Sequence, residues 1–380
     1  MQRETYIQTI NQLFDVNPVV ALLGPRQCGK TTVAKQFIEQ TNEPVLLLDL
    51  ENPYDLARLD APMLTLEPHT GLIIIDEIQL RPELFPVLRV LIDQKKSRKW
   101  LILGSASRDL IRQSSETLAG RISYLEMTPF ALSEVTDREK LWINGGFPPS
   151  YLANNEDTSF QWRQDYISTF LERDIPMLGF QIPARAMRRF WMMLSHYHGQ
   201  TFNASEIGKS MGISHVTSRH YLDILTGTFM IRELMPWLEN LGKRQVKSPK
   251  IYFRDSGIYH TLMDIKNYQT LFYHPKLGAS WEGFALEQII IKMKSRIEDC
   301  YYWGIHGQAE LDLLLFKNGK RLGFEFKYSD APRLTKSMSI AYELLNLDKL
   351  FVITPADVQY HLTENIEVVN LNTFIKSKLD

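Results

Sequence analysis

The sequence predicts an α/β protein whose N-terminal part is built on a parallel β-sheet. Between residues 18 and 135, short apolar segments alternate with helical patterns. Strands that are apolar on both faces and joined by helices are typical of a parallel sheet covered on both sides. Residues 300–327 instead alternate apolar and polar side chains, which indicates a second sheet near the C-terminus.

The composition sets limits on function. The chain has 380 residues, 44% of them hydrophobic, and a formal net charge of -1. It can therefore bury more than one core, and any nucleic-acid surface must be a local patch. Cys28 and Cys300 lie far apart, so neither a disulfide framework nor a zinc site is indicated. The polar N-terminus lacks the apolar core of a signal peptide, and no apolar run approaches ~20 residues. We therefore expect a cytoplasmic protein without membrane spans.

The strands can be assigned in order along the chain. Those of the N-terminal sheet lie in PVVALLG, PVLLLDL, LIIIDEI, WLILGSAS and ISYLEM, and helical patterns stand at TTVAKQFIEQ and LFPVLRVLIDQ. In the C-terminal part, a helix in SWEGFALEQIIIKMKSRI precedes strands expected at 300–303, 310–316 and 321–327, and LFVIT supplies one more.

A phosphate-binding loop follows the first strand. The segment GPRQCGKTT fits the pattern GxxxxGK[ST] and opens a helix, which is the context that the motif requires. Its backbone N–H groups would cradle phosphate oxygens, Lys30 would reach the β- and γ-phosphates of ATP, and Thr31 would hold Mg²⁺. The alternative is a glycine-rich turn with a coincidental lysine. The expected nucleotide-binding residues are Gly24, Pro25, Arg26, Gln27, Cys28, Gly29, Lys30, Thr31 and Thr32.

Acidic and hydroxyl side chains end two further strands of this sheet. Asp76 and Glu77 close the strand in LIIIDEI, at the edge where α/β proteins place their sites. We expect Asp76 to hold Mg²⁺ and Glu77 to polarise the attacking water, which favours hydrolysis over mere binding. Ser105, or less favourably Ser107, would hydrogen-bond that water or the γ-phosphate.

Arg121, in LAGR, stands just before the last strand of the sheet. In ring ATPases, an arginine near this point reaches the nucleotide of the neighbouring subunit and stabilises transition-state charge. An ordinary solvated or salt-bridged arginine is an equally good interpretation.

Taken in order, GPRQCGKT, LIIIDE, GSAS, ETLAGR, GGFP and LERDIP (residues 171–176) resemble a large family of prokaryotic AAA-type ATPases. The resemblance covers nearly the whole chain. It implies an AAA+ P-loop core, an oligomer that is possibly hexameric, and a C-terminal domain with a restriction-endonuclease-like core.

The middle of the chain resembles a winged helix-turn-helix. In TFNASEIGKSMGISHVTSRHYLDIL, Ser205 and Ser214 can cap two helices on either side of the tight turn at Gly212. The second helix would present Arg219, with His215 and Ser218, where a recognition helix contacts DNA.

A basic stretch, LGKRQVKSPKIYFR, follows the second helix. It suits phosphate contacts, with Lys243, Arg244 and Lys247 as candidate DNA-binding residues. The alternatives are a protein-binding or lid module and a solvated basic run.

The last candidate site gathers acids around a hairpin. Glu282 lies early in a helix, Asp312 starts a strand, and Glu325 and Lys327 share one face of the next strand. This helix–strand–strand order resembles the PD-(D/E)xK nucleases, including Holliday-junction resolvases, in which carboxylates hold Mg²⁺ and the lysine steadies a water or phosphate. Leu311 stands where the full pattern has proline. The alternative is an inherited fold whose acids are inactive.

These interpretations predict four regions. They are an AAA+ P-loop ATPase core at 1–135, a helical lid at 136–200, a winged helix-turn-helix at 201–270 and a nuclease-like domain at 271–380. The first functional hypothesis is an oligomeric Mg²⁺-dependent ATPase that moves or remodels branched or structured DNA and can cut it. The second is a nucleotide-switched scaffold whose C-terminal half binds protein.

Overall fold

The computed structural model describes residues 1–94, 97–105, 118–239 and 245–377, which fold into two compact units. Unit 1 comprises residues 1–129, 169–182 and 227–230, and unit 2 comprises residues 130–168, 183–226 and 231–380. The chain therefore leaves the first unit after residue 129 and returns to it twice. The sequence predicts domain borders near residues 135, 200 and 270, and these borders remain predictions.

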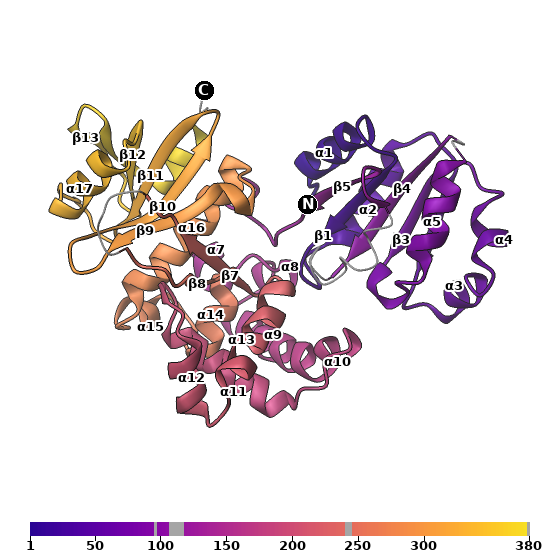
Figure 1. Cartoon of the computed structure of the whole chain (residues 1–380), viewed down its shortest axis with the longest axis horizontal. Helices are drawn as coiled ribbons and strands as arrows, with labels where there is room; N and C mark the ends of the chain where they lie inside the picture. Colours follow the sequence, from indigo (N-terminus) through magenta and orange to yellow (C-terminus); the bar gives the residue numbers. More distant parts are fainter. Residues whose placement is uncertain (95–96, 106–117, 240–244, 378–380) are drawn as a thin grey trace. The chain divides into compact units, whose positions relative to one another are not determined.

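Unit 1 contains the predicted parallel sheet (Figure 1). Its strand order is β2-β3-β4-β1-β5, and every neighbouring pair is parallel. The strands are β1 (Val19–Leu23), β2 (Val45–Asp49), β3 (Gly71–Asp76), β4 (Arg98–Gly104) and β5 (Ile122–Glu126). All five coincide with the segments that the sequence assigns as strands.

Helices cover both faces of this sheet because its strands are apolar on both faces. Val33 and Phe37 pack against alternate strand residues such as Leu22 on one face, and Leu88 and Leu91 belong to the core cluster on the other. The helices are α1 (Glu4–Phe14), α2 (Lys30–Gln40), α3 (Pro53–Arg58), α4 (Pro62–Leu66), η1 (Ile78–Leu80) and α5 (Leu84–Asp93). The returning segment 169–182 adds a π-helical turn, η3 (Phe170–Asp174), and α10 (Ile175–Met177).

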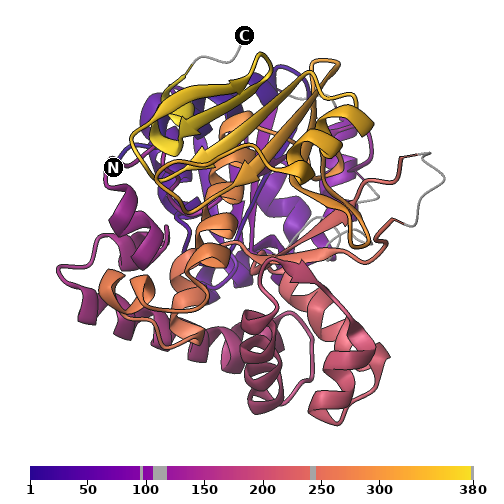
Figure 2. The same ribbon diagram turned by 90° about the vertical axis from the view of Figure 1, so that its left-hand side faces the viewer.

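Unit 2 is built on a nine-stranded mixed sheet, of which β9–β14 are the orange and yellow strands in Figures 1 and 2. Its order is β13-β14-β12-β11-β10-β9-β7-β8-β6. The strands are β6 (Gln200–Thr201), β7 (Ile231–Pro236), β8 (Lys250–Phe253), β9 (Cys300–Ile305), β10 (Ala309–Lys317), β11 (Lys320–Phe326), β12 (Lys349–Thr354), β13 (Gln359–Thr363) and β14 (Ile366–Asn370). The predicted C-terminal strands are present.

The helices of unit 2 come mainly before and between these strands. They are α7 (Arg138–Asn144), α8 (Pro148–Tyr151), α9 (Glu156–Thr169), α11 (Ala184–His196), α12 (Ala204–Met211), α13 (His215–Gly227), α14 (Ser256–Leu262), α15 (Tyr268–Phe272), α16 (Leu277–Met293), η4 (Ile297–Asp299), α17 (Lys336–Leu344) and α18 (Leu371–Lys376). Among the helices of the described ranges, none has the length and apolar character needed to cross a membrane.

A two-residue turn fixes the hairpin of β10 and β11. Asn318 and Gly319 both have positive φ, 50° and 76°, as a tight hairpin turn requires. The register pairs Lys317 with Lys320 and Leu313 with Phe324. Asp312 and Glu325 stand next to the last of these pairs, so the turn places the two carboxylates at neighbouring positions of the hairpin.

The GGFP segment has a structural role in unit 2. Gly146 N–H donates to Asp255 Oδ2 at 2.7 Å, and Asp255 Oδ1 caps α14 by accepting from Ile258 N–H at 2.9 Å. A Cβ on Gly145, whose φ is 74°, would lie 2.2 Å from Asp255 Oδ1. Only glycine allows this approach, so the motif holds the carboxylate that starts α14.

Candidate nucleotide and acid-cluster sites

The phosphate-binding loop connects β1 to α2, at the carboxyl end of the parallel strands. Gly29 has a φ of 103°, and a Cβ on Gly24 would lie 2.1 Å from the carbonyl oxygen of Met127. Cys28 is completely buried, and its Sγ donates to that same carbonyl at 3.8 Å. The two glycines are therefore required by the path of the backbone, and Cys28 fills space beneath it.

Three polar side chains meet at the start of α2. Lys30 Nζ donates to the carbonyl oxygens of Gly24 and Pro25, both at 3.0 Å, so its ammonium group lies within the loop. Thr31 Oγ1 donates to Asp76 Oδ2 at 2.6 Å. Burial raises the pKa of the Asp76 carboxyl, and the hydrogen bond from Thr31 opposes that rise. A hydroxyl and a carboxylate thus lie side by side next to a buried ammonium group.

Glu77 is held in a defined orientation next to this group. Its Oε2 accepts a hydrogen bond from Ser105 Oγ at 3.0 Å and another from Gln79 Nε2. Gln79 Nε2 also donates to Ser105 Oγ at 2.9 Å, which closes a three-residue network. Glu77 has a φ of 56°, a left-handed conformation that is rare outside glycine and clusters at functional sites.

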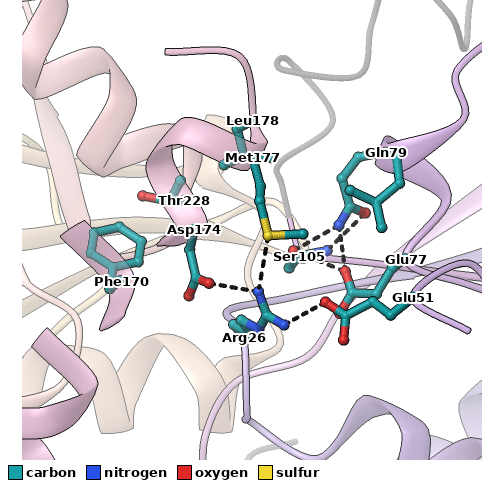
Figure 3. Close-up of a pocket in the computed structure, with 11 residues that line it drawn as sticks. Arg26, Glu51, Glu77, Gln79, Ser105, Phe170, Asp174, Met177, Leu178 and Thr228 are labelled. Atoms are coloured by element: carbon teal, nitrogen blue, oxygen red, sulfur yellow. Dashed lines mark hydrogen bonds and ion pairs between the residues drawn. The ribbon is translucent and has the colours of Figure 1, made fainter. Parts of the chain in front are cut away.

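Arg26 and Glu77 line the same pocket (Figure 3). The Arg26 guanidinium donates to Asp174 Oδ1 at 2.6 Å and to Glu51 Oε1 at 2.5 Å. Glu51 follows β2, whereas Asp174 ends the π-helical turn η3, so residues distant in sequence meet at one guanidinium.

The structure brings together most of the residues that the sequence assigns to nucleotide binding. Gln27 and Thr32 are exposed on the loop and the first turn of α2, and Pro25 is buried. Ser107 lies outside the described residues.

Arg121 lies at the opposite end of the sheet. It immediately precedes β5, at the amino end of the strands, where its guanidinium makes a bidentate ion pair with Asp93 at 2.7 and 3.2 Å. The phosphate-binding loop follows the carboxyl end of β1. Arg121 therefore cannot reach the nucleotide of its own subunit, and a role as an arginine finger requires a neighbouring subunit.

Comparisons with known protein families give matches to three regions of the chain. Residues 16–136 match the model of an AAA domain, and residues 135–269 and 277–374 each match a domain of unknown function (DUF8612 and DUF4143). Uncharacterized protein Rv2008c of Mycobacterium tuberculosis and uncharacterized protein Mb2031c of Mycobacterium bovis are each 45% identical over 355 residues, which is 93% of this chain and 80% of theirs. The chain belongs to the same family as these two proteins.

The AAA match coincides with the sheet and phosphate loop of unit 1, so this protein is an AAA-type ATPase of the P-loop class. Among solved structures, the Walker-type ATPase of Pyrococcus abyssi is 15% identical, with a TM-score of 0.47, over 69% of this chain and 95% of that one. RuvB of Thermotoga maritima is 14% identical, with a TM-score of 0.30, over 60% and 86%.

The acidic residues of unit 2 converge as the hairpin register requires. Lys327 Nζ lies 2.7 Å from Glu325 Oε2 and 3.9 Å from Asp312 Oδ2. Asp312 Oδ2 also accepts from Phe326 N–H at 3.0 Å. Glu282 joins this group, which we call the acid cluster, through Lys250, whose Nζ lies 3.7 Å from Glu282 Oε1. Burial, together with the Asp312 charge, raises the pKa values of both Glu282 and Glu325.

A second lysine, which the sequence does not assign to the site, enters the acid cluster from β8. Lys250 Nζ pairs with Glu310 and lies 3.7 Å from Glu282 Oε1 and 3.9 Å from Asp312 Oδ1. Tyr252, two residues on, donates its hydroxyl to Glu282 Oε1 at 2.7 Å. The ammonium groups of Lys250 and Lys327 therefore lie between the carboxylates, at positions that a bridging metal cation would otherwise occupy. Within the described ranges, no three His, Cys, Asp or Glu side chains are arranged to hold a metal ion.

The two helices that the sequence predicts on either side of Gly212 are present as α12 and α13, with Gly212 in the left-handed conformation between them. Asn203, rather than the expected Ser205, caps α12, whereas Ser214 Oγ accepts from Thr217 N–H as expected. Ser218 was expected to face outwards but is completely buried, since it shares the apolar face of α13 with Leu222 one turn later.

The candidate DNA-binding cations are only partly free of internal partners. Arg219 is held by Asp223 and Glu233 at 2.6 and 2.5 Å. Lys247 is exposed. Lys243 and Arg244 lie outside the described residues. In the same basic stretch, Lys250 is a buried member of the acid cluster, so it does not face a DNA phosphate as the run of basic residues suggested.

Sequence reasoning missed several residues of the two sites: Glu51, Gln79, Asp174, Lys250, Tyr252 and Glu310. A signal existed for two of them. Gln79 stands two residues after Glu77, and Asp174 lies inside the LERDIP motif. Lys250 and Tyr252 alternate on a strand, but no local pattern says that this strand faces the acid cluster.

Proposed function

We propose that this ATPase hydrolyses Mg²⁺-bound ATP at the loop of residues 24–32. The observation that carries the proposal is the 2.6 Å contact of Thr31 Oγ1 with Asp76 Oδ2, next to the Lys30 ammonium group. Mg²⁺ prefers hard oxygen ligands and is usually held by one carboxylate together with a hydroxyl and substrate phosphates. The residues present therefore fit Mg²⁺, with Thr31 and Asp76 as its holders.

Each of the remaining side chains has a role in this proposal. Lys30 binds the β- and γ-phosphates, and the bound metal neutralises charge on the phosphate oxygens. Glu77 accepts the hydrogen bond of the attacking water and orients it towards the γ-phosphate. Ser105 and Gln79 keep the Glu77 carboxylate in place through hydrogen bonds, because a freely rotating carboxylate would orient water poorly.

Nucleotide binding tests this proposal without reference to turnover. Titration of a fluorescent ATP analogue should give saturable binding in Mg²⁺ and weaker binding in EDTA. Lys30→Ala should weaken binding by at least about tenfold, the equivalent of one charge-assisted contact to phosphate. Lys35→Ala, at an exposed position of α2 outside the loop, is the matched control and should bind normally. Equal affinities of wild type and Lys30→Ala would contradict the assignment.

For unit 2 we propose an action on branched or structured DNA. The active form in this proposal is a homo-oligomer, such as a hexamer, in which Arg121 of unit 1 acts on the neighbouring subunit. The convergence of Glu282, Asp312, Glu325 and Lys327 supports a phosphodiester-handling site, since carboxylates and a lysine in this order are what such chemistry uses. The helix-turn-helix and the exposed Lys247 support DNA binding.

A second candidate function is a nucleotide-switched scaffold that binds protein through unit 2. The observation that favours it is the internal pairing of the cations expected to contact DNA. Arg219 is held by two carboxylates, Lys250 is buried in the acid cluster, and Arg254 lies 3.8 Å from Glu287. Cations that already satisfy protein carboxylates contribute less to phosphate binding.

Salt dependence separates the two functions. Binding to duplex, forked and four-way DNA should weaken linearly in log–log coordinates as salt rises, with a slope set by the number of phosphate contacts. Replacing Lys243, Arg244 and Lys247 together by alanine should flatten that slope by up to about three contacts. A triple variant that binds DNA as the wild type does would favour the scaffold.

Metal dependence is a separate experiment on the acid cluster. Mn²⁺ binding is measured by calorimetry in wild type and in Lys250→Met, which removes the ammonium group between Glu282 and Asp312. If the carboxylates are a metal site, the variant should bind Mn²⁺ more tightly, and Asp312→Ala should abolish binding. An absence of binding in both wild type and Lys250→Met would make the cluster a structural one.

A further inference from the structure

The LERDIP motif supplies a side chain to the nucleotide pocket. Asp174, its fourth residue, is nearly buried, with 8% of its side chain exposed, and its Oδ1 accepts from Arg26 at 2.6 Å (Figure 3). Burial raises the pKa of this carboxyl, and the charge of Arg26 opposes the rise. The carboxylate therefore depends on the arginine for its stability, and loss of that partner would disfavour the present position of η3.

Arg26 is placed to contact a terminal phosphate as well. It belongs to the loop itself, two residues after Gly24, and it lines the same pocket as Glu77 and Ser105. In the proposed mechanism, Glu77 orients water towards the γ-phosphate and Ser105 holds the Glu77 carboxylate. A guanidinium that already binds two carboxylates is well suited to a phosphate, because its fork matches either anion.

The segment that carries Asp174 has an unusual position in the chain. Residues 169–182 belong to unit 1, although the residues directly before and after them belong to unit 2. The segment is continuous in the chain with α9, which ends at Thr169, and it is followed by α11, which begins at Ala184. A movement of this segment would thus be passed by covalent connection to two helices of unit 2. Its π-helical turn is a feature frequent at functional sites.

We propose that Arg26 is shared between the γ-phosphate of ATP and the Asp174 carboxylate, so that ATP, unlike ADP, weakens the Arg26–Asp174 ion pair and loosens residues 169–182. ADP lacks the γ-phosphate and leaves the pair intact. Glu51 provides the second carboxylate that holds Arg26 when the γ-phosphate does not. This inference rests on the proposed nucleotide site. It adds to that site an ion pair, Arg26–Asp174, whose strength depends on whether ATP or ADP is bound.

The affinities for ATPγS and ADP provide the first test. Asp174→Asn removes the competing charge and should raise the affinity for ATPγS about fivefold, as expected for one charge-assisted hydrogen bond. The affinity for ADP should change less than twofold. Glu172→Gln removes an exposed charge two residues away and is the matched control, which should change neither affinity. Equal changes for the two nucleotides in Asp174→Asn would overturn the proposal.

Hydrogen exchange of the segment provides the second test. In wild type, peptides covering residues 169–182 should exchange faster with ATPγS than with ADP. In Arg26→Ala they should exchange equally fast with both nucleotides. Identical exchange with both nucleotides in wild type would overturn the proposal.

Two experimental outcomes have a cause other than an error in the inference about Arg26 and Asp174. If wild type binds neither nucleotide, the proposed nucleotide site is wrong. If Asp174→Asn does not fold, Glu51→Gln decides, because Glu51 is one-third exposed and holds the same guanidinium. It should raise the ratio of ATPγS to ADP affinity in the same direction, and an unchanged ratio would count against the proposal.

Discussion

Replacing Asp255 by alanine should destabilise unit 2 by about 3 kcal/mol. The carboxylate caps α14 through Ile258 N–H, and loss of such a cap costs about 1 kcal/mol. It also accepts from Gly146 N–H at 2.7 Å in the buried GGFP turn. Leaving a buried donor without a partner costs a further 1–3 kcal/mol, so we take about 2 for this part.

A matched control separates these two contributions. Asp137 caps α7 by accepting from Lys140 N–H at 2.9 Å, but this residue is exposed. Asp137→Ala should therefore cost only about 1 kcal/mol.

Chemical denaturation followed by tryptophan fluorescence measures this difference. All of the seven tryptophans except Trp100 belong to unit 2, so the signal reports on the unit in question. If Asp255→Ala proves no more destabilising than Asp137→Ala, the GGFP turn does not depend on this carboxylate and the reasoning is refuted.

Three further predictions concern catalysis, assembly and pH. Ser105→Ala removes one hydrogen bond from Glu77 and should lower kcat for ATP about fivefold with ATP affinity unchanged, and an unchanged kcat would remove Ser105 from the site. Mixing Arg121→Ala with Lys30→Ala subunits should restore part of the ATPase activity, because mixed interfaces pair an intact arginine with an intact loop; a fully active monomer would exclude this. Burial lowers the pKa of His198 to about 3 in the folded protein, whereas a histidine in the unfolded chain has a pKa near 6.5. As the pH falls, the unfolded chain therefore binds a proton that the folded protein does not bind. Wild type should lose about 1.3 kcal/mol of stability through this residue between about pH 7 and 5.5, and His198→Asn should lose less by that amount.

Local sequence patterns were sufficient to predict parts of the fold and of the candidate sites. The apolar strands and the GxxxxGK[ST] loop predict the sheet of unit 1, and in the structure Thr31 contacts Asp76 as those patterns require. The alternation around Asn318 and Gly319 predicts the hairpin that brings Asp312 and Glu325 to the same lysine, Lys327. In both cases, the chain segments that form the feature are short and each carries its own signal.

Features that depend on contacts between residues far apart in the sequence could not be predicted from local patterns. Asp174 reaches Arg26 only because residues 169–182 return to the first unit, and no pattern in LERDIP indicates that return. Lys250 belongs to a stretch of the sequence that is rich in basic residues, which suggested an exposed position, yet its strand buries it among carboxylates. Ser218 was assigned to the wrong face because helical spacing alone did not fix which side of α13 packs inwards.

The central claim is that Glu77 activates water for ATP hydrolysis at a loop that binds the nucleotide independently of it. Glu77→Gln keeps the size of the side chain and its contact with Ser105 but removes the negative charge. The most direct test measures ATP affinity and steady-state hydrolysis in this variant. We predict an affinity within about threefold of wild type and a kcat at least about 100-fold lower, as for loss of a general base. Hydrolysis at the wild-type rate in Glu77→Gln would contradict the claim.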